Sequence, residues 1–134
     1  MLDHTGVIVS DFKISSKWYA EALKSIGYVK LMEFGKEITK STDVAGFGEK
    51  VSAKPDFWIS GATESKPVNK PAIHVAFRAH NRNQVDEFYT AAIKVGERDN
   101  GKPGPRPHYH ENYYGAFVLD PDGHNIEVVC HDPV

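Results

Sequence analysis

The sequence contains a single cysteine, Cys130, among its 134 residues. One thiol excludes a disulfide framework within the chain and a zinc site built from several cysteines. It also favours a reducing compartment, so we expect a cytoplasmic protein. No stretch approaches the roughly 18 apolar residues that a membrane-spanning helix requires, and the first residues lack the pattern of a secretory signal. We therefore predict a soluble, unprocessed protein without a membrane partner.

The chain also has little excess of charge of either sign. Sixteen Lys and Arg residues oppose eighteen Asp and Glu residues, which leaves a net charge of −2, and there is no run of like charges. This balance argues against nucleic acid as the main partner. A chain of this length forms one ordinary domain that buries roughly two-thirds of its unfolded surface.

An internal repeat is the strongest signal in the sequence. Residues 4–24 align without gaps on residues 74–94, at an offset of 70 residues. The identical pairs are His4 with His74, Tyr19 with Tyr89, Ala22 with Ala92 and Lys24 with Lys94. Because these matches fall where a strand–turn–helix unit would place its buried positions, we interpret them as two copies of one unit.

Each copy predicts a strand followed by an amphipathic helix. The strands are residues 4–9 and 74–79, and alternation places each histidine on the same face as a small residue, which leaves room for a ligand. Apolar residues spaced by four, Ile14, Trp18, Ala22 and Ile26, predict the first helix, and Gly27 and Gly96 are placed to end the two helices.

The remaining segments complete an α+β fold of two paired βαβββ modules, which form a curled mixed sheet around a cleft. The modules are residues 1–60 and 72–134, joined by a linker over 61–71. Further strands are expected at 28–34, 56–60, 113–120 and 124–130, a Gly-rich turn at 45–50, a hairpin turn at 121–123, and a long functional loop at 99–112.

Three strings carry a family resemblance: DHTGVIVSDFKISSKWYAEAL from residue 3, HVAF from residue 74, and FVLDPDGHNIEVV from residue 117. In these three strings the chain resembles members of the vicinal oxygen chelate superfamily, also called the glyoxalase/bleomycin resistance/dioxygenase superfamily. The resemblance implies a homodimer that acts on a small molecule. It also implies a metal site at His4, His74 and Glu127.

The chemistry of these residue types agrees with a metal site. Glu127 lies between Ile126 and Val128 on a predicted strand, and a buried carboxylate is costly unless a positive group meets it. One divalent metal ion (Zn, Ni, Mn, Co or Fe(II)) held by two imidazoles and this carboxylate would keep coordination positions open, as catalysis requires.

The first module lacks a carboxylate in the position that corresponds to Glu127. An offset of 69 or 70 residues leads to Trp58 or Phe57. Glyoxalase I typically has an acidic fourth ligand there, so the chain departs from that pattern. Extradiol dioxygenases are among the three-ligand members of the superfamily.

Side chains near the expected cleft supply further candidates. His110 is the predicted general acid or base, because it lies in the 99–112 loop nearest to the following strand. The predicted substrate-binding residues are Arg78, Arg106, His108, Tyr109, Tyr113 and Trp58. Cys130 alternates onto the face opposite Glu127, so we expect a buried apolar residue there and not a nucleophile.

These observations favour an enzyme of the glyoxalase-like lyase/isomerase type, in which the metal stabilises enolate-type charge on a small oxygenated substrate. One alternative is an Fe(II) ring-cleaving dioxygenase that uses the same three ligands. The other is a metal-free binding protein of the bleomycin resistance type, which sequesters a toxic compound.

Overall fold

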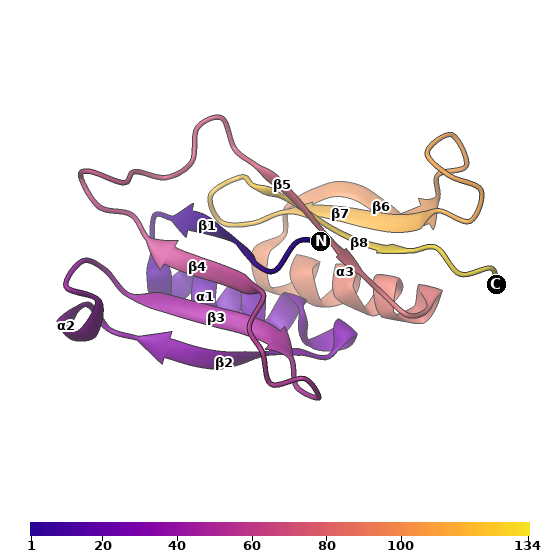
Figure 1. Ribbon diagram of the computed structural model, residues 1–134. Helices are drawn as coiled ribbons and strands as arrows, with labels where there is room; N and C mark the ends of the chain where they lie inside the picture. Colours follow the sequence, from indigo (N-terminus) through magenta and orange to yellow (C-terminus); the bar gives the residue numbers. More distant parts are fainter.

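The computed structural model describes all residues, 1–134, as two four-stranded sheets with helices on one side (Figure 1). The first module comprises β1 (Thr5–Val9), α1 (Phe12–Ala22), a 3-10 turn η1 (Lys24–Ile26), β2 (Tyr28–Phe34), α2 (Lys36–Thr39), β3 (Val44–Glu49) and β4 (Phe57–Gly61). The second comprises β5 (His74–Arg78), α3 (Arg82–Gly96), β6 (Asp99–Pro105), β7 (Tyr114–Leu119) and β8 (Asn125–Cys130).

Both sheets have the same topology. The strand orders are β1-β4-β3-β2 and β5-β8-β7-β6, with the first pair of each sheet parallel and the other pairs antiparallel. The two sheets share no strand ladder, so the eight strands do not close into a barrel. The predicted α+β fold of two βαβββ modules is confirmed. None of the helices has the length and apolar character needed to cross a membrane.

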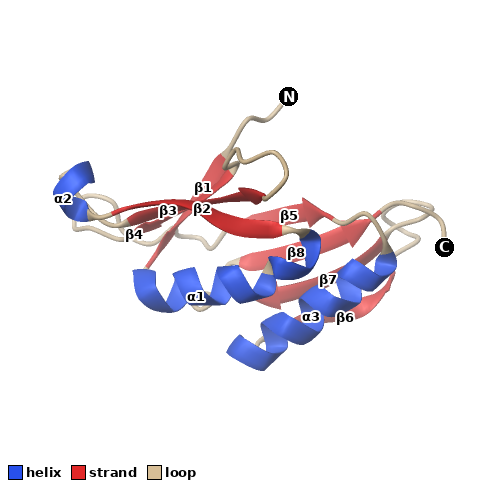
Figure 2. Cartoon of the chain, turned by 90° about the horizontal axis from the view of Figure 1, so that it is seen from below, coloured by secondary structure: helices blue, strands red, loops and turns tan.

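The two modules bury the same faces. Helices α1 and α3 pack side by side against one face of the sheets, while the short helix α2 lies beyond the end of the first sheet and covers neither face (Figure 2). In β1 and β5 the predicted apolar faces point to the helices, with Val7, Val9 and Phe77 buried. The rings of Phe57 and Phe77, one from each module, lie 5.1 Å apart between centroids and join the two halves of the core.

The helices also begin in the same way. Asp11 accepts a hydrogen bond from the backbone of Ile14, and Asn81 accepts one from Gln84, so each residue caps the helix that follows. These two cap residues are aligned by the 70-residue repeat. The repeat therefore extends from sequence to local structure.

Two sequence predictions of irregular structure were wrong. Residues 45–50 form most of the buried strand β3 and not a turn. Gly46 and Gly48 let neighbouring groups approach the strand closely. A Cβ at Gly46 would lie 2.9 Å from the Trp58 ring, and a Cβ at Gly48 would lie 2.3 Å from the Lys54 carbonyl oxygen. The first half of the expected 99–112 loop is the edge strand β6, whose register shifts accommodate its prolines.

The helix predictions also need correction at their ends. Gly27 ends η1 in a left-handed conformation, as expected, with φ 82°. Gly96 remains inside α3, and Glu97 takes the left-handed position instead. A side chain at Gly96 would come within 2.5 Å of the indole nitrogen of Trp18, so packing explains this glycine. Ile14 is 58% exposed and does not extend the buried stripe of α1.

A buried polar network joins the two modules. The hydroxyl of Tyr19 donates to Asp120 Oδ2 at 2.5 Å, and Asp120 Oδ1 accepts the backbone N–H of His124. His124 Nδ1 accepts the N–H of Ile73 at 3.1 Å, and its other ring nitrogen lies 3.4 Å from the carbonyl oxygen of Ile8. These contacts connect α1, the β7–β8 turn and the first strand of each module.

Replacing Tyr19 with Phe is expected to lower the free energy of unfolding by about 1–3 kcal/mol, because a buried oxygen of Asp120 loses its donor. Burial, followed by the charge of Asp120, raises the pKa of Tyr19 well above its ordinary value. Above about pH 10 the unfolded chain therefore loses this proton first, and stability falls as pH rises.

The Tyr19→Phe protein should show a shallower loss of stability on the alkaline side. Denaturant unfolding between pH 7 and pH 11 measures both effects. Tyr109→Phe is the matched control, because that side chain is 60% exposed and its hydroxyl makes no hydrogen bond. Equal unfolding energies for the two variants would contradict the assigned role of the network.

Candidate functional site

His74 and Glu127 form a pair on the uncovered face of the second sheet. They lie on the neighbouring parallel strands β5 and β8, where Glu127 pairs with Ala76, and His74 Nε2 is 2.9 Å from Glu127 Oε1. The glutamate side chain is 1% exposed, whereas the histidine side chain is 51% exposed. The carboxylate is therefore held inside the protein, and the imidazole stands between it and solvent.

Tyr113 holds the second oxygen of the carboxylate. Its hydroxyl donates to Glu127 Oε2. Burial, followed by the hydrogen bond and charge of Glu127, raises the pKa of Tyr113 above its ordinary value, so the hydroxyl stays protonated at neutral pH. Beneath this contact lies Gly115, where a Cβ would be 3.3 Å from Oε2. The contacts with His74 and Tyr113 fix the orientation of the carboxylate.

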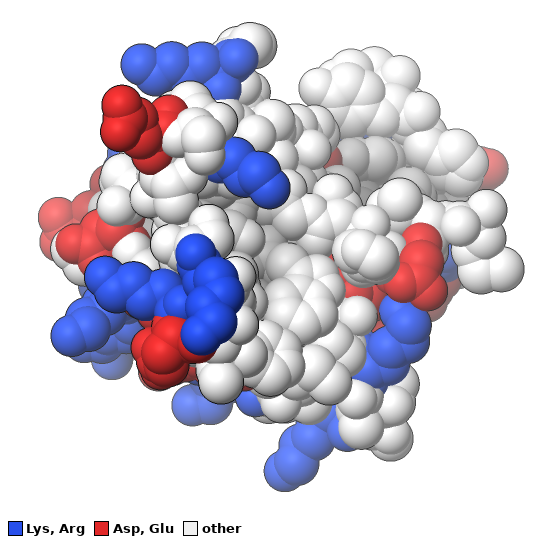
Figure 3. Space-filling view, turned by 60° about the vertical axis from the view of Figure 1, so that its left-hand side comes forward, with Lys and Arg blue, Asp and Glu red and all other residues white.

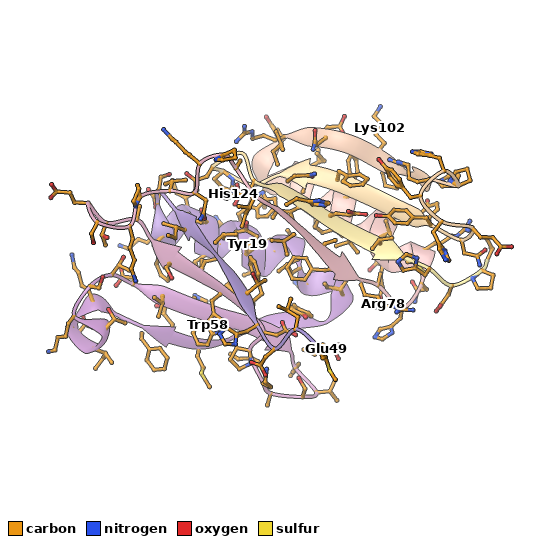
Figure 4. All side chains as sticks on the ribbon, turned by 45° about the horizontal axis from the view of Figure 1, so that its top comes forward. Tyr19, Glu49, Trp58, Arg78, Lys102 and His124 are labelled. Carbon is orange, nitrogen blue, oxygen red and sulfur yellow. The ribbon has the colours of Figure 1, made fainter.

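His4 lies elsewhere, at the start of the first sheet. It is exposed, and its Nδ1 is 2.7 Å from Asp3 Oδ1. It borders a hollow of about 610 Å³ over the uncovered face of the first sheet, together with Trp58 and Met32. Figure 4 shows Trp58 on this face. Within one chain, no three His, Cys, Asp or Glu side chains form a group that could hold a metal ion. The structure thus brings together two of the three predicted ligands.

The strand register identifies the residue that corresponds to Glu127. In the second sheet Ala76 pairs with Glu127, and in the first sheet Gly6 pairs with Trp58. The repeat aligns Gly6 with Ala76, so Trp58 occupies the equivalent place. Its indole covers Gly46, whose Cβ would lie 2.9 Å from the ring. In the first module, an aromatic surface lies where the second module has its carboxylate.

The predicted loop candidates gather beside Tyr113. The rings of Tyr109 and Tyr113 are 5.2 Å apart between centroids, and those of His108 and Tyr109 are 4.2 Å apart. His110 is exposed and faces His131 at 5.5 Å. His131 in turn lies 5.2 Å from Tyr113. His110 is thus separated from the His74–Glu127 pair by two rings.

The two predicted arginines differ in their surroundings. The guanidinium of Arg106 lies over the ring of Phe117 at 5.6 Å and donates to the carbonyl oxygens of Gly104 and Lys102, which closes the end of β6. Arg78 is exposed at the end of β5. Of the two, only Arg106 has a fixed place near the pair.

Phe117 and Gly115 were not predicted as site residues from the sequence. Phe117 pairs with Glu127 across β7 and β8, and its ring lies 6.2 Å from that of His74. The sequence did contain a signal for Phe117: a residue paired with Glu127 on the neighbouring strand must lie on the same face of the sheet.

The surface in Figure 3 carries interspersed charges of both signs around uncharged areas.

A family model described as the Glyoxalase/Bleomycin resistance protein/Dioxygenase superfamily matches residues 1–128. A solved glyoxalase/bleomycin resistance protein from Albidiferax ferrireducens T118 is 23% identical, with a TM-score of 0.75 over 98% of this chain and 99% of that chain. No curated protein matches the sequence.

Two further structures share the fold. A glyoxalase I mutant from Zea mays is 22% identical, with a TM-score of 0.73 over 96% of this chain and 46% of that chain. A glyoxalase/bleomycin resistance protein/dioxygenase family enzyme from Burkholderia phytofirmans PsJN is 17% identical, with a TM-score of 0.67 over 97% of this chain and 98% of that chain. This chain therefore matches about half of the maize chain in length.

Proposed function

The chain belongs to the glyoxalase/bleomycin resistance protein/dioxygenase superfamily, and we propose that it is a glyoxalase-like, metal-dependent lyase or isomerase that acts on a small oxygenated substrate. The observation that supports this proposal is the His74–Glu127 pair. A carboxylate that is 1% exposed and an imidazole that is 51% exposed lie 2.9 Å apart on a sheet face without a helix.

The donor set of this pair suits a divalent cation. One imidazole nitrogen and one carboxylate oxygen are ligands for Zn, Ni, Mn, Co and Fe(II), and a cation would compensate the buried charge of Glu127. The hydrogen bond from Tyr113 resembles the outer contacts that orient metal ligands in proteins. The residues present therefore fit the metal that members of this superfamily commonly bind.

We assign the third ligand to His4 of a second copy of the chain. His4 is exposed and lies outside any group of potential ligands in its own chain. Both sheets leave one face without a helix, so the first sheet of one copy can lie over the second sheet of another. A homodimer of this kind has two equivalent sites, each with two histidines and one glutamate.

The chain's own residues would prepare the substrate and move the proton. Glu127 is kept oriented by Tyr113, while Phe117 provides an apolar wall beside His74. Arg106, stacked on that wall, adds positive charge where the substrate develops negative charge. A bound divalent metal supplies Lewis acidity that stabilises enolate-type charge. His110 would exchange protons with solvent at the rim of the site, beyond His131 and Tyr113.

A ring-cleaving Fe(II) dioxygenase is the second candidate, and the position of Trp58 favours it. Because Trp58 replaces a fourth, acidic ligand, the proposed set is two histidines and one carboxylate, which suits oxygen chemistry at Fe(II). Aerobic turnover of a catechol, lost when the iron is oxidised, would favour this candidate over the lyase.

Metal analysis of the purified protein tests the proposal. We expect about one divalent ion per chain by elemental analysis, removed by a chelator and restored when Zn, Ni, Mn, Co or Fe(II) is added. A protein that takes up none of these ions would instead be a metal-free binding protein of the bleomycin resistance type.

A further inference from the structure

A second, smaller pocket lies on the uncovered face of the first sheet. It has a volume of about 280 Å³ and lies between the loop that follows α2 and the loop that follows β4. It adjoins the hollow beside His4, because Val44 and Ser60 line both. Nothing in the proposed mechanism uses this pocket.

Hydroxyl-bearing residues dominate the lining of this pocket. Five of its nine residues carry a hydroxyl, namely Thr39, Ser41, Thr42, Ser60 and Thr63, and the only charged residue is Lys66. No acidic side chain lines it, and the ammonium group of Lys66 makes no ion pair. A lysine that shares a concave site with hydroxyl donors and no carboxylate suits an anion with several oxygens.

Several of the hydroxyl donors are free. The hydroxyls of Ser41, Thr42 and Ser60 make no hydrogen bond in the structure. The backbone at Lys66 is held by a tight turn, in which its N–H donates to Thr63 Oγ1 at 3.0 Å, and the residue is exposed.

The geometry points to a phosphate-binding subsite, in which Lys66 and the hydroxyls of Thr42 and Ser60 hold a phosphate group of the substrate. This inference rests on the proposed function, because it names the substrate class of that site. Hydroxyl donors from three segments of the chain line the same pocket as one ammonium group, which suits the several oxygens of a phosphate. The volume of 280 Å³ is suited to a head group and not to a whole cofactor.

The position of the pocket sets the length of the substrate. Ile8, which lines the pocket, and His4 share one face of β1 and its N-terminal extension and are four residues apart. At about 3.3 Å per residue, this separation is about 13 Å. The apolar surface of Trp58 and Met32 lies in the adjoining hollow. We therefore expect a phosphorylated molecule whose reacting oxygens lie about 13 Å from its phosphate.

Titration of inorganic phosphate into the full-length, isotopically labelled protein tests the inference. We expect saturable amide shifts at Thr42, Ser60 and Lys66, and about tenfold weaker binding in Lys66→Ala, because a charge-assisted contact is lost. Thr42→Val should weaken binding by a smaller factor while it preserves the packing. Lys70→Ala is the control, since that exposed lysine is in the same loop but does not line the pocket.

The outcomes separate this inference from the proposed function. Absence of phosphate binding, binding unchanged in Lys66→Ala, or equal affinity for acetate would overturn the phosphate subsite. Metal content is measured on the same samples and should be unchanged in Lys66→Ala. Phosphate binding in a protein that takes up no metal would leave the subsite standing and remove the metal-dependent function. Metal uptake without phosphate binding would leave the metal-dependent function standing and remove the phosphate subsite.

Discussion

Replacing His74 with Ala, or Glu127 with Gln, is expected to reduce bound metal to less than about a tenth of the wild-type content. Each substitution removes one of two ligands that converge within a chain. Activity should fall about 100-fold or more, because the charge that develops on the substrate loses its stabilising cation. Elemental analysis and the turnover assay measure these losses.

The matched controls replace the same residue types away from the pair. His80→Ala and Glu111→Gln alter exposed side chains that do not line the site, so metal content should stay at the wild-type level. Glu127→Gln retains a side-chain oxygen for the hydroxyl of Tyr113, which limits the effect on folding. If a folded Glu127→Gln protein kept its full metal content, the carboxylate would have no role as a ligand.

Mixing two inactive variants is expected to restore activity if each site is shared between two chains. His4→Ala lacks the ligand of the first sheet, and His74→Ala lacks the ligand of the second. A dimer with one copy of each has one site with both substitutions and one intact site. Random exchange makes about half of the dimers mixed, so about a quarter of the wild-type sites should return.

The mixture therefore distinguishes a shared site from a site within one chain. The variants are unfolded together and refolded, and each is also refolded alone as a control. Metal content and turnover should reach about a quarter of the wild-type values only in the mixture. No recovery from a mixture that contains mixed dimers would show that His4 does not complete the site of a partner.

Much of the fold was predictable because it depends on local patterns. The 70-residue repeat located both strand–helix units, and strand alternation placed Val7 and Phe77 in the core and His74 toward the open face. Cys130 is buried, as its alternation with Glu127 predicted. These features follow from the periods of strands and helices, which are properties of neighbouring residues.

The errors arose where distant contacts override local preference. Gly46 and Gly48 are typical of turns, yet they lie in β3 because the Trp58 ring and the Lys54 backbone fill the space above them. The prolines of β6 are tolerated because this strand is at the edge of its sheet. The groups beside the glycines and the edge position of β6 cannot be read from the local sequence, since they depend on other segments of the chain.

The repeated module, the faces of its first strands and the chemical types of the candidate ligands could be read from the sequence, because they follow from spacing along one element. The folded chain was needed to show that Glu127 meets His74, that Trp58 occupies the equivalent place in the first sheet, and that His4 lies apart. Strand register and sheet packing set the distances between side chains that are far apart in the chain, and neither is contained in local spacing.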